Sequence, residues 1–265
     1  MRKVRVGIFC RTARFVPPEA APVRFLVAIP VFNEQKHLPQ VLDAVGRYAS
    51  DVLVVDDGST DGTGDILRRR GRLTVLTHPT NRGYGRSLID AFGLAAAAGH
   101  DWMLSIDCDN QHEASQIPDF LAEARRGRAD VISGSRYRSP RRDDDVAPPD
   151  RRRINACITW ILNETLGLSL TDAFCGFKAY RVAALAGLSL DVDGYAFPLQ
   201  FWVQAALAGL SIRELPVRRL YPDPNRHFGG ALDDPDARLR HYLDVFDREL
   251  RRVGWSRARR PAARA

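Results

Sequence analysis

Short apolar segments that end in acidic or amide side chains recur through the first half of the chain and most constrain its fold. Residues 25–29, 51–55 and 102–106 have the continuous apolar composition of strands buried on both faces. Helical patterns separate them, and further strand patterns cover residues 73–76 and 130–133. Buried strands that alternate with helices predict a mostly parallel central sheet covered by helices on both faces, which is an α/β/α sandwich.

Between and after these strands, apolar side chains recur at helical spacing. The helices predicted from this spacing cover residues 34–48, 61–70, 85–98, 117–126, 154–166, 197–207 and 238–250. The second half also contains short extended pieces at 174–180 and a strand at 212–217. Residues 138–153 interrupt the pattern with Pro, Arg and consecutive Asp residues. We interpret this break as a mobile loop, which either serves as a lid or is a plain disordered insertion.

The length of 265 residues fits one large α/β domain with short additions at its ends. We predict a poorly ordered N-terminal lead-in over residues 1–23, an α/β domain over residues 24–235, and a C-terminal helix with a basic tail over residues 236–265. Arg residues gather at both ends of the chain. Such ends are usually solvated, although they could also contact an anionic membrane surface.

Polar side chains follow three of the predicted strands at the point where each strand ends. Asn33 and Glu34 follow the first strand, residues 56–57 are both Asp and follow the second, and Asp107 and Asp109 follow a later one. Ligands of parallel sheets bind at the carboxyl ends of the strands. The coincidence of these clusters therefore predicts one ligand site at this edge of the sheet.

Two carboxylates two residues apart, directly after a buried strand, can share a divalent cation with a diphosphate. Asp107 and Asp109 have this spacing, and Gln111 and His112 add polar groups at the same turn. Mg²⁺ and Mn²⁺ prefer such oxygen ligands, and Mg²⁺ often takes only one or two from the protein. The pattern therefore favours a Mg²⁺ or Mn²⁺ ion bound together with a diphosphate.

A second acidic turn, with the sequence VVDDGSTDGT over residues 54–63, suits recognition of a nucleoside. The carboxylate of Asp57 could accept hydrogen bonds from a base or a ribose. Gly58 allows close approach of the backbone. Asp61 is interpreted as the cap of the following helix.

The net charge is +7, and nearly all the basic residues are Arg. We interpret most of this excess as a base-composition bias toward Arg codons. Arginine also binds phosphate with a planar fork, so an anionic ligand fits the composition. We disfavour a nucleic-acid-binding protein, because acidic clusters occupy the sheet edge where a polyanion groove would be basic. The four Cys residues form no Cys-x-x-Cys pair, which argues against a zinc or redox motif.

We also predict a cytoplasmic protein without a transmembrane segment. No run of 18 apolar residues exists, and the longest candidate, residues 196–210, is interrupted by Gln and shorter than a bilayer span. With no secretion signal, reduced thiols in the cytosol are the simplest interpretation of the Cys residues.

Several motifs together resemble the family 2 glycosyltransferases, in particular the branch of the dolichyl-phosphate mannosyltransferases and related polyprenyl-phosphate glycosyltransferases. In chain order they are IPVFNE (29–34), VVDDGSTDGT (54–63), NRGYG (81–85), DCDNQH (107–112), GSRY (134–137) and DAFCGF (172–177). The resemblance covers roughly residues 24–220. It implies a Rossmann-like α/β/α sandwich of the nucleotide-diphosphosugar type known as GT-A, and an inverting transfer of a sugar.

The resemblance also implies a donor site for a GDP- or UDP-sugar. The residues implied to bind the donor nucleotide are Pro30, Phe32, Glu34, Asp57 and Asp107. The residues implied to hold the metal and the diphosphate are Asp107, Asp109 and Gln111.

On the acceptor side, Arg136 is implied to face the diphosphate or an acceptor phosphate, and Asp172 to act as a base or to contact the sugar. The resemblance does not decide which arginine of an adjoining cluster assists: Arg151, Arg152 or Arg153. Arg226, and with less weight His227, could meet an acceptor phosphate. The chain departs from the family pattern at residues 113–114, where Glu-Ala replaces an expected Pro, and in the late loop 224–230.

We therefore expect an inverting, metal-dependent glycosyltransferase that acts on a polyprenyl phosphate at the inner face of the cytoplasmic membrane. An alternative is transfer to a soluble or glycan hydroxyl, for which Asp172 would take the proton. A nucleotidyltransferase is a further alternative. It would be expected to carry a Gly-rich, Arg-containing loop after the first strand, where this chain has Pro-Val-Phe-Asn-Glu at 30–34.

Overall fold

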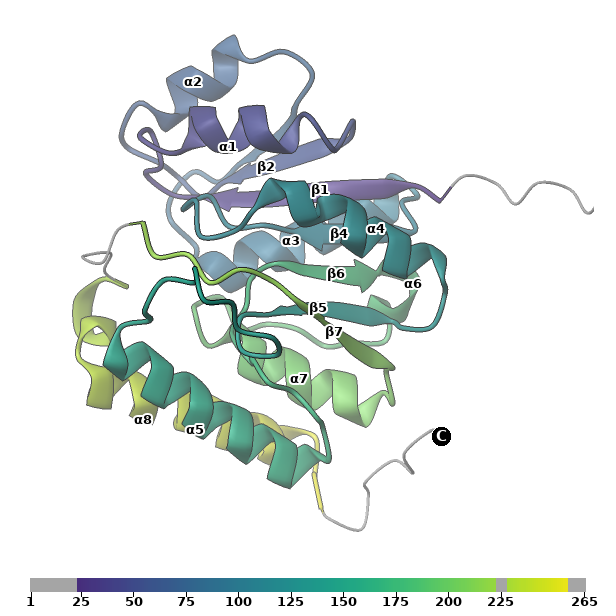
Figure 1. Ribbon diagram of the computed structural model, residues 1–265, viewed down its shortest axis with the longest axis vertical. Coiled ribbons are helices and arrows are strands. Elements are labelled where there is room, and N and C mark those ends of the chain that lie inside the picture. Colours follow the sequence, from purple (N-terminus) through teal and green to yellow (C-terminus); the bar gives the residue numbers. More distant parts are fainter. Residues whose placement is uncertain (1–22, 223–227, 257–265) are drawn as a thin grey trace, which may run out of the picture.

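The computed structural model describes residues 23–222 and 228–256 (Figure 1). The strands are β1 (Phe25–Val31), β2 (Val52–Asp56), β3 (Thr74–Thr77), β4 (Trp102–Ser105), β5 (Val131–Ser135), β6 (Lys178–Arg181) and β7 (Ile212–Pro216). The helices are α1 (Leu38–Val45), α2 (Thr63–Arg69), α3 (Tyr84–Ala97), α4 (Ile117–Arg125), α5 (Pro149–Leu166), α6 (Val182–Leu185), α7 (Phe197–Leu207) and α8 (Pro235–Arg252). The predicted lead-in up to residue 22, Arg226, His227 and the tail from residue 257 lie outside the described residues.

The strands form one seven-stranded sheet in the order β3-β2-β1-β4-β6-β5-β7. All neighbouring pairs are parallel except those of β6, which runs antiparallel to both β4 and β5. The mostly parallel sheet predicted from the strand pattern is therefore confirmed. Because β6 is reversed, its first residue lies at the edge where the parallel strands end.

Helices cover both faces of the sheet, as predicted (Figure 1). Successive residues of β1 point to opposite faces: Val27 and Ile29 pack with α1, α2 and α4. Leu26 and Ala28 belong to the larger core with α3, α5, α6, α7 and α8. A sheet buried on both faces explains the unbroken apolar composition of its central strands.

The structure differs from the sequence prediction at several boundaries. β1 continues to Val31 because it stays paired with β2 beyond the end of its pairing with β4. The predicted loop over residues 138–153 ends earlier, since α5 begins at Pro149. The part before α5 is hydrogen-bonded to the segment after β7: the N–H of Asp145 donates to the carbonyl of Arg219, and its carboxylate accepts from the N–H of Tyr221.

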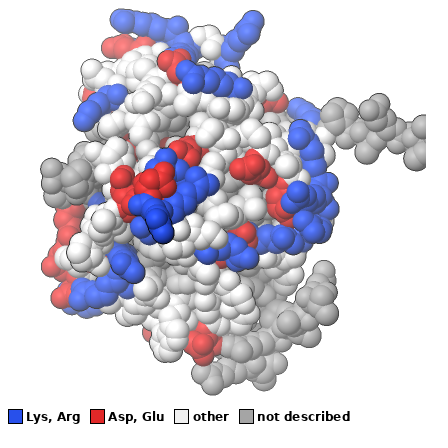
Figure 2. All heavy atoms as spheres, in the orientation of Figure 1, with Lys and Arg blue, Asp and Glu red and all other residues white. Residues whose placement is uncertain are grey.

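The C-terminal helix α8 packs against α7 and α5. Its Tyr242, Val245 and Phe246 are buried in the larger core. No helix of the described residues is long and apolar enough to cross a membrane. On the face in Figure 2, Lys and Arg side chains lie interspersed with Asp and Glu side chains.

Candidate functional site

A pocket of about 510 Å³ opens at the carboxyl edge of the sheet, where the polar clusters were predicted to meet. Its wall contains residues that follow β1, β2, β4 and β5, together with parts of α5, α7 and α8. The predicted site residues that line it are Pro30, Phe32, Glu34, Asp57, Asp107, Asp109, Gln111, Arg136 and Arg151.

The turn after β4 holds its carboxylates through local hydrogen bonds. Asp109 Oδ1 accepts from the N–H of Gln111 at 3.0 Å, and Gln111 is buried. Asp107 Oδ1 accepts from the hydroxyl of Tyr84 at 3.1 Å, and its Oδ2 lies 3.3 Å from His112 Nε2. Tyr84, at the start of α3, thereby ties the NRGYG motif to this acidic turn.

Gly176 leaves the space in which the Asp107 carboxylate lies. A Cβ atom at position 176 would stand 2.1 Å from Asp107 Oδ2, far closer than a carbon and an oxygen can approach. The turn before β6 therefore needs glycine for the acidic turn after β4 to keep its shape.

The donor set at this turn fits a hard divalent cation shared with a ligand. No three His, Cys, Asp or Glu side chains among the described residues form a metal cage. Asp107 and Asp109 offer carboxylate oxygens beside the amide of Gln111, within one pocket wall. Mg²⁺ sites that include substrate phosphates commonly use only one or two protein carboxylates.

The predicted nucleoside contact, Asp57, is bound to a backbone turn. Its Oδ1 accepts from the N–H of Arg82 and its Oδ2 from the N–H of Gly83, both at 2.8 Å. His78 Nδ1 lies 2.7 Å from Oδ1, and its Nε2 lies 3.1 Å from Asp90 Oδ2. A carboxylate has about four acceptor positions, so one remains for a ligand.

The loops after β1 and β2 are joined by side-chain caps. Asn33 has a φ of 56°, and its Oδ1 accepts from the N–H of Thr60 at 2.8 Å. Asp61 accepts from the N–H of Thr63, the first residue of α2, and from that of Gln35. Asp61 immediately precedes Gly62, the N-cap residue of α2, and accepts a hydrogen bond from a backbone N–H at the start of that helix. This agrees with the capping role predicted for Asp61.

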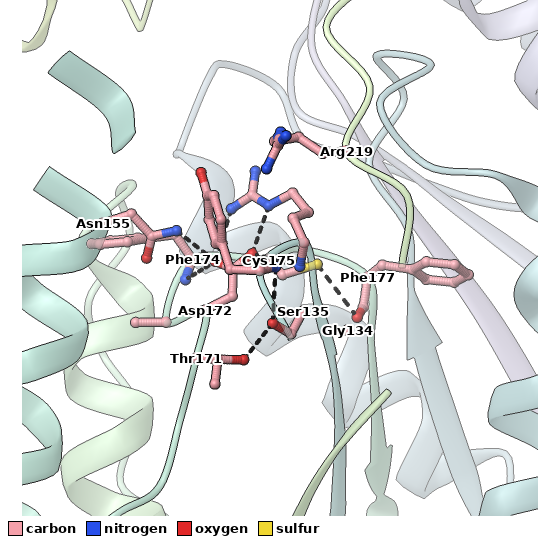
Figure 3. A network of polar contacts seen from close by, with 12 residues as sticks. Gly134, Ser135, Asn155, Thr171, Asp172, Phe174, Cys175, Phe177 and Arg219 are labelled. Carbon is pink, nitrogen blue, oxygen red and sulfur yellow. Dashed lines mark hydrogen bonds and ion pairs between the residues drawn. The ribbon is translucent and has the colours of Figure 1, made fainter. Parts of the chain in front are cut away.

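Arg136 and Asp172 form a buried, two-pronged ion pair. Arg136 Nε donates to Asp172 Oδ2 at 2.7 Å, and its terminal nitrogen donates to Oδ1 at 2.9 Å. Asn155 of α5 also donates to Oδ1, at 2.8 Å (Figure 3). The Arg136 guanidinium lines the pocket, whereas Asp172 is completely buried behind it.

This geometry argues against the predicted role of Asp172 as a base. Burial raises its pKa, but the charge and hydrogen bonds of Arg136 outweigh burial, so that the pKa lies below its usual value. A carboxylate with no exposed surface and so many donors is a poor proton acceptor. The contacts of Asp172 are those of a residue that positions Arg136.

The three arginines 151–153 occupy successive positions on helix α5 and therefore point in different directions. Arg151 lines the pocket, and its guanidinium lies 4.9 Å from the ring centre of Phe228. Arg152 and Arg153 are exposed, and Arg153 lies 3.4 Å from Asp236 at the start of α8. The structure therefore brings only Arg151 of this cluster to the pocket.

The half of the pocket formed by α5, α7 and α8 is largely aromatic and apolar. The apolar and aromatic side chains that line this half are Ile154, Phe174, Tyr195, Phe197, Pro198, Phe201, Tyr221, Phe228, Leu232 and Tyr242. Arg238, whose side chain is buried, lies over Phe228 on the α8 side at 4.5 Å. The pocket thus combines an acidic half with an apolar half that carries arginines.

Some lining residues were missed by the sequence analysis. Tyr84 belongs to a quoted motif, but its contact with Asp107 depends on how α3 meets β4. Lys178 directly follows the DAFCGF motif and begins β6, which places it on the pocket wall. The sequence signal that could have identified Lys178 as a site residue is a lysine at the start of a buried strand.

Comparison with known proteins identifies relatives along most of the chain. The model of the family described as "Glycosyl transferase family 2" matches residues 26–188. Undecaprenyl-phosphate mannosyltransferase of Micrococcus luteus is 36% identical over 206 residues, which is 74% of this chain and 83% of the relative. Polyprenol monophosphomannose synthase of Mycolicibacterium smegmatis is 30% identical over 73% of this chain and 76% of its own.

Solved structures share the fold at lower sequence identity. Glucosyl-3-phosphoglycerate synthase from Mycobacterium tuberculosis, in complex with Mn²⁺, UDP and phosphoglyceric acid, gives a TM-score of 0.65 at 19% identity. The match covers 89% of this chain and 80% of that structure. TarS from S. aureus in complex with UDP-GlcNAc gives a TM-score of 0.59 at 18% identity, over 89% of this chain and 69% of that one.

Proposed function

Because the chain belongs to glycosyl transferase family 2, we propose that this glycosyltransferase moves a sugar from a GDP- or UDP-sugar to a polyprenyl phosphate, with inversion at the anomeric carbon. The names of the two sequence relatives support the acceptor class, since both refer to a mannose linked to a polyprenyl phosphate. The observation that carries the proposal is the division of the pocket into an acidic half and an apolar half.

In this proposal the acidic half binds the donor. Pro30, Phe32, Glu34 and Asp57 line the part of the pocket assigned to the nucleoside, and Asp107 and Asp109 the part assigned to the diphosphate. Mg²⁺ or Mn²⁺ held by Asp107, Asp109 and Gln111 would stabilise the negative charge of the departing diphosphate.

The apolar half binds the acceptor. Its aromatic side chains offer contact surface for a prenyl chain, and Arg136 and Arg151 offer guanidinium groups for the phosphate. The carboxylates that line the described pocket, Glu34, Asp57, Asp107 and Asp109, all belong to the donor half. A hydroxyl acceptor would need a base here, whereas a phosphate is already an anion near neutral pH.

The reaction is then a direct displacement at the anomeric carbon. Arg136, whose orientation is held by Asp172, stabilises the phosphate oxygens and their developing charge. The apolar wall excludes water, which would otherwise compete with the acceptor for the sugar. Asp172 positions Arg136 and receives no proton.

The proposed location is cytoplasmic and peripheral, at a membrane surface that contains the lipid acceptor. Arg152 and Arg153 are exposed at the start of α5, next to the acceptor half of the pocket. Basic side chains near an anionic bilayer each contribute about 1 kcal/mol of attraction.

A transfer assay tests the function. Purified protein is incubated with radiolabelled GDP-mannose, UDP-glucose or another nucleotide sugar, Mn²⁺, and undecaprenyl phosphate in detergent. We expect label in the lipid phase and release of nucleoside diphosphate. Transfer to a soluble hydroxyl acceptor, with none to the lipid under the same conditions, would reject the polyprenyl-phosphate proposal; release of pyrophosphate would indicate a nucleotidyltransferase.

A further inference from the structure

Lys178 is a buried cation in the pocket wall that the reaction described above does not use. It is 3% exposed, and its ammonium lies 4.4 Å from the ring centre of Trp202 and 6.0 Å from that of Phe201. Within residues 23–222 and 228–256, its ammonium makes no hydrogen bond or ion pair. A buried ammonium without an anion is costly unless a ligand supplies one.

The reversed strand β6 places this lysine between the two halves of the pocket. Lys178 pairs with Ser105 at the end of β4 on one side and with Ser133 of β5 on the other. Asp107 follows β4, and Arg136 follows β5. Lys178 therefore stands one strand beyond the proposed diphosphate site, in the direction of the acceptor half.

The carboxylates around Lys178 are bound to other partners. Asp172 is paired with Arg136, and Glu214 accepts from the N–H and the hydroxyl of Thr171. Asp107 accepts from Tyr84. Burial lowers the pKa of Lys178 to about 8, while these carboxylates act in the opposite direction, so the group is mostly charged at pH 7. Its charge is available to an anion in the pocket.

We propose that Lys178 binds the phosphate of the acceptor, together with Arg136, at the junction between the donor and acceptor halves. The inference rests on the proposed function, because it names a further residue for the same acceptor. A phosphate there meets an ammonium from β6 and a guanidinium from the end of β5. Lys178 lines the pocket, and the ring of Trp202 lies beside its ammonium as a cation–π partner rather than as an anion.

Paired ligands separate the contribution of the phosphate from that of the chain. Calorimetry compares farnesyl phosphate with farnesol, which lacks only the phosphate, on wild type, Lys178→Met and Lys36→Met. Methionine removes the charge but keeps an unbranched apolar side chain in contact with the same wall. Lys36 is exposed and lies outside the pocket wall, so it provides the matched control.

We expect Lys178→Met to weaken farnesyl phosphate binding by about 10- to 100-fold, the effect of losing one charge-assisted hydrogen bond. Farnesol affinity, the affinity for nucleoside diphosphate with Mn²⁺, and the thermal midpoint should stay within about 3-fold or a few degrees of wild type. Lys36→Met should match wild type throughout.

The outcomes are distinguishable. If wild type does not prefer farnesyl phosphate to farnesol, the acceptor proposal itself fails. If wild type shows the preference and Lys178→Met keeps it, the inference about Lys178 is wrong. A loss of nucleoside diphosphate affinity equal to the loss for farnesyl phosphate would assign Lys178 to the donor instead. An equal loss of affinity for farnesol and for farnesyl phosphate would mean that Lys178 only shapes the pocket. In that case Lys178→Arg, which keeps the charge but changes the shape, would also lose affinity for both ligands.

Discussion

At the scale of single residues, the carboxylate of Asp109 allows a clean test of the proposed metal site. Its Oδ1 accepts from the N–H of Gln111, a bond that asparagine can keep. Asp109→Asn should therefore leave the fold intact but remove the part of nucleoside diphosphate affinity that depends on Mn²⁺. We expect a loss of at least about 10-fold, since a charge-assisted contact contributes about 1.5–3 kcal/mol.

Calorimetry with and without EDTA measures this effect. Asp244→Asn is the matched control, because Asp244 is exposed on α8 and does not line the pocket. Equal affinities of wild type and Asp109→Asn in Mn²⁺ would remove Asp109 from the metal site.

The ion pair behind the pocket predicts a loss of stability. Asp172→Asn leaves the buried guanidinium of Arg136 without its counter-charge, and breaking such a pair typically costs about 3–5 kcal/mol. Urea unfolding at pH 7 measures the change. A smaller effect than that of an exposed pair, below about 1 kcal/mol, would contradict the structural role given to Asp172.

The same variant predicts the direction of a pH effect. Burial raises the pKa of Asp172, yet Arg136 outweighs burial and holds the pKa below its usual value. Such a carboxyl stabilises the fold fully above its unfolded pKa of about 4, and this stability is lost as the pH falls toward the folded pKa. The difference in unfolding free energy between wild type and Asp172→Asn should be constant from about pH 7 to pH 5 and shrink below about pH 4. A difference that grows on acidification would reverse the assigned sign.

Local motifs were sufficient to predict which residues line the acidic half of the pocket, because they lie at or shortly after the ends of β1, β2 and β4. Asp107 and Asp109 are examples, and both line the pocket. The sequence could not show that Arg151, rather than Arg152 or Arg153, lines the pocket. This depends on the position of each residue around helix α5, whose start lies within the Pro- and Asp-rich segment that we predicted to be a loop. Lys178 was missed because strand reversal, rather than its neighbours in sequence, brings it to the site.

At the scale of elements, the turn into β6 is predicted to depend on Gly176. A Cβ there would stand 2.1 Å from Asp107 Oδ2, so Gly176→Ala must displace that carboxylate. We expect the Mn²⁺-dependent affinity for nucleoside diphosphate to fall by at least about 10-fold, as for loss of the carboxylate contact itself. Gly187→Ala is the control, because a Cβ at position 187 meets no atom within 4 Å.

Both variants are compared by calorimetry and by their thermal midpoints. If Gly176→Ala and Gly187→Ala bind nucleoside diphosphate with equal affinity in Mn²⁺, the turn into β6 does not constrain the acidic turn after β4.

The strands and most helices could be predicted because apolar runs and helical spacing are local signals. Element ends were less accurate: α1 begins at Leu38 rather than at 34, since residues 34–37 form a turn ahead of Pro39.

At the scale of the whole molecule, the exposed side of α5 allows a test of the proposed peripheral membrane location. Trp160 is 64% exposed, and Arg153 lies two helical turns earlier on the same side. An aromatic ring beside basic groups is the composition of an interfacial anchor. We expect sedimentation with anionic vesicles at low salt, weakened as salt screens the charges.

Trp160→Ser should reduce the bound fraction at every salt concentration, whereas Tyr48→Ser should not. Tyr48 is also exposed but follows α1, which covers the opposite face of the sheet. Binding that is equal for both variants, or that does not depend on salt, would contradict this orientation.

The reversed strand in the middle of the sheet has a consequence for the order of folding. β1, β2 and β3 come from the first 77 residues and pair with their neighbours in the sequence, whereas β6, which begins at residue 178, pairs with β4 and β5 across longer separations. Loop closure over such separations is slow compared with pairing of neighbouring segments. On the ribosome, the first three strands should therefore form first, and the half of the pocket proposed to bind the donor should remain inactive until β6 arrives. Pulse-labelling hydrogen exchange during refolding should show protection of β1 and β2 before that of β5 and β6.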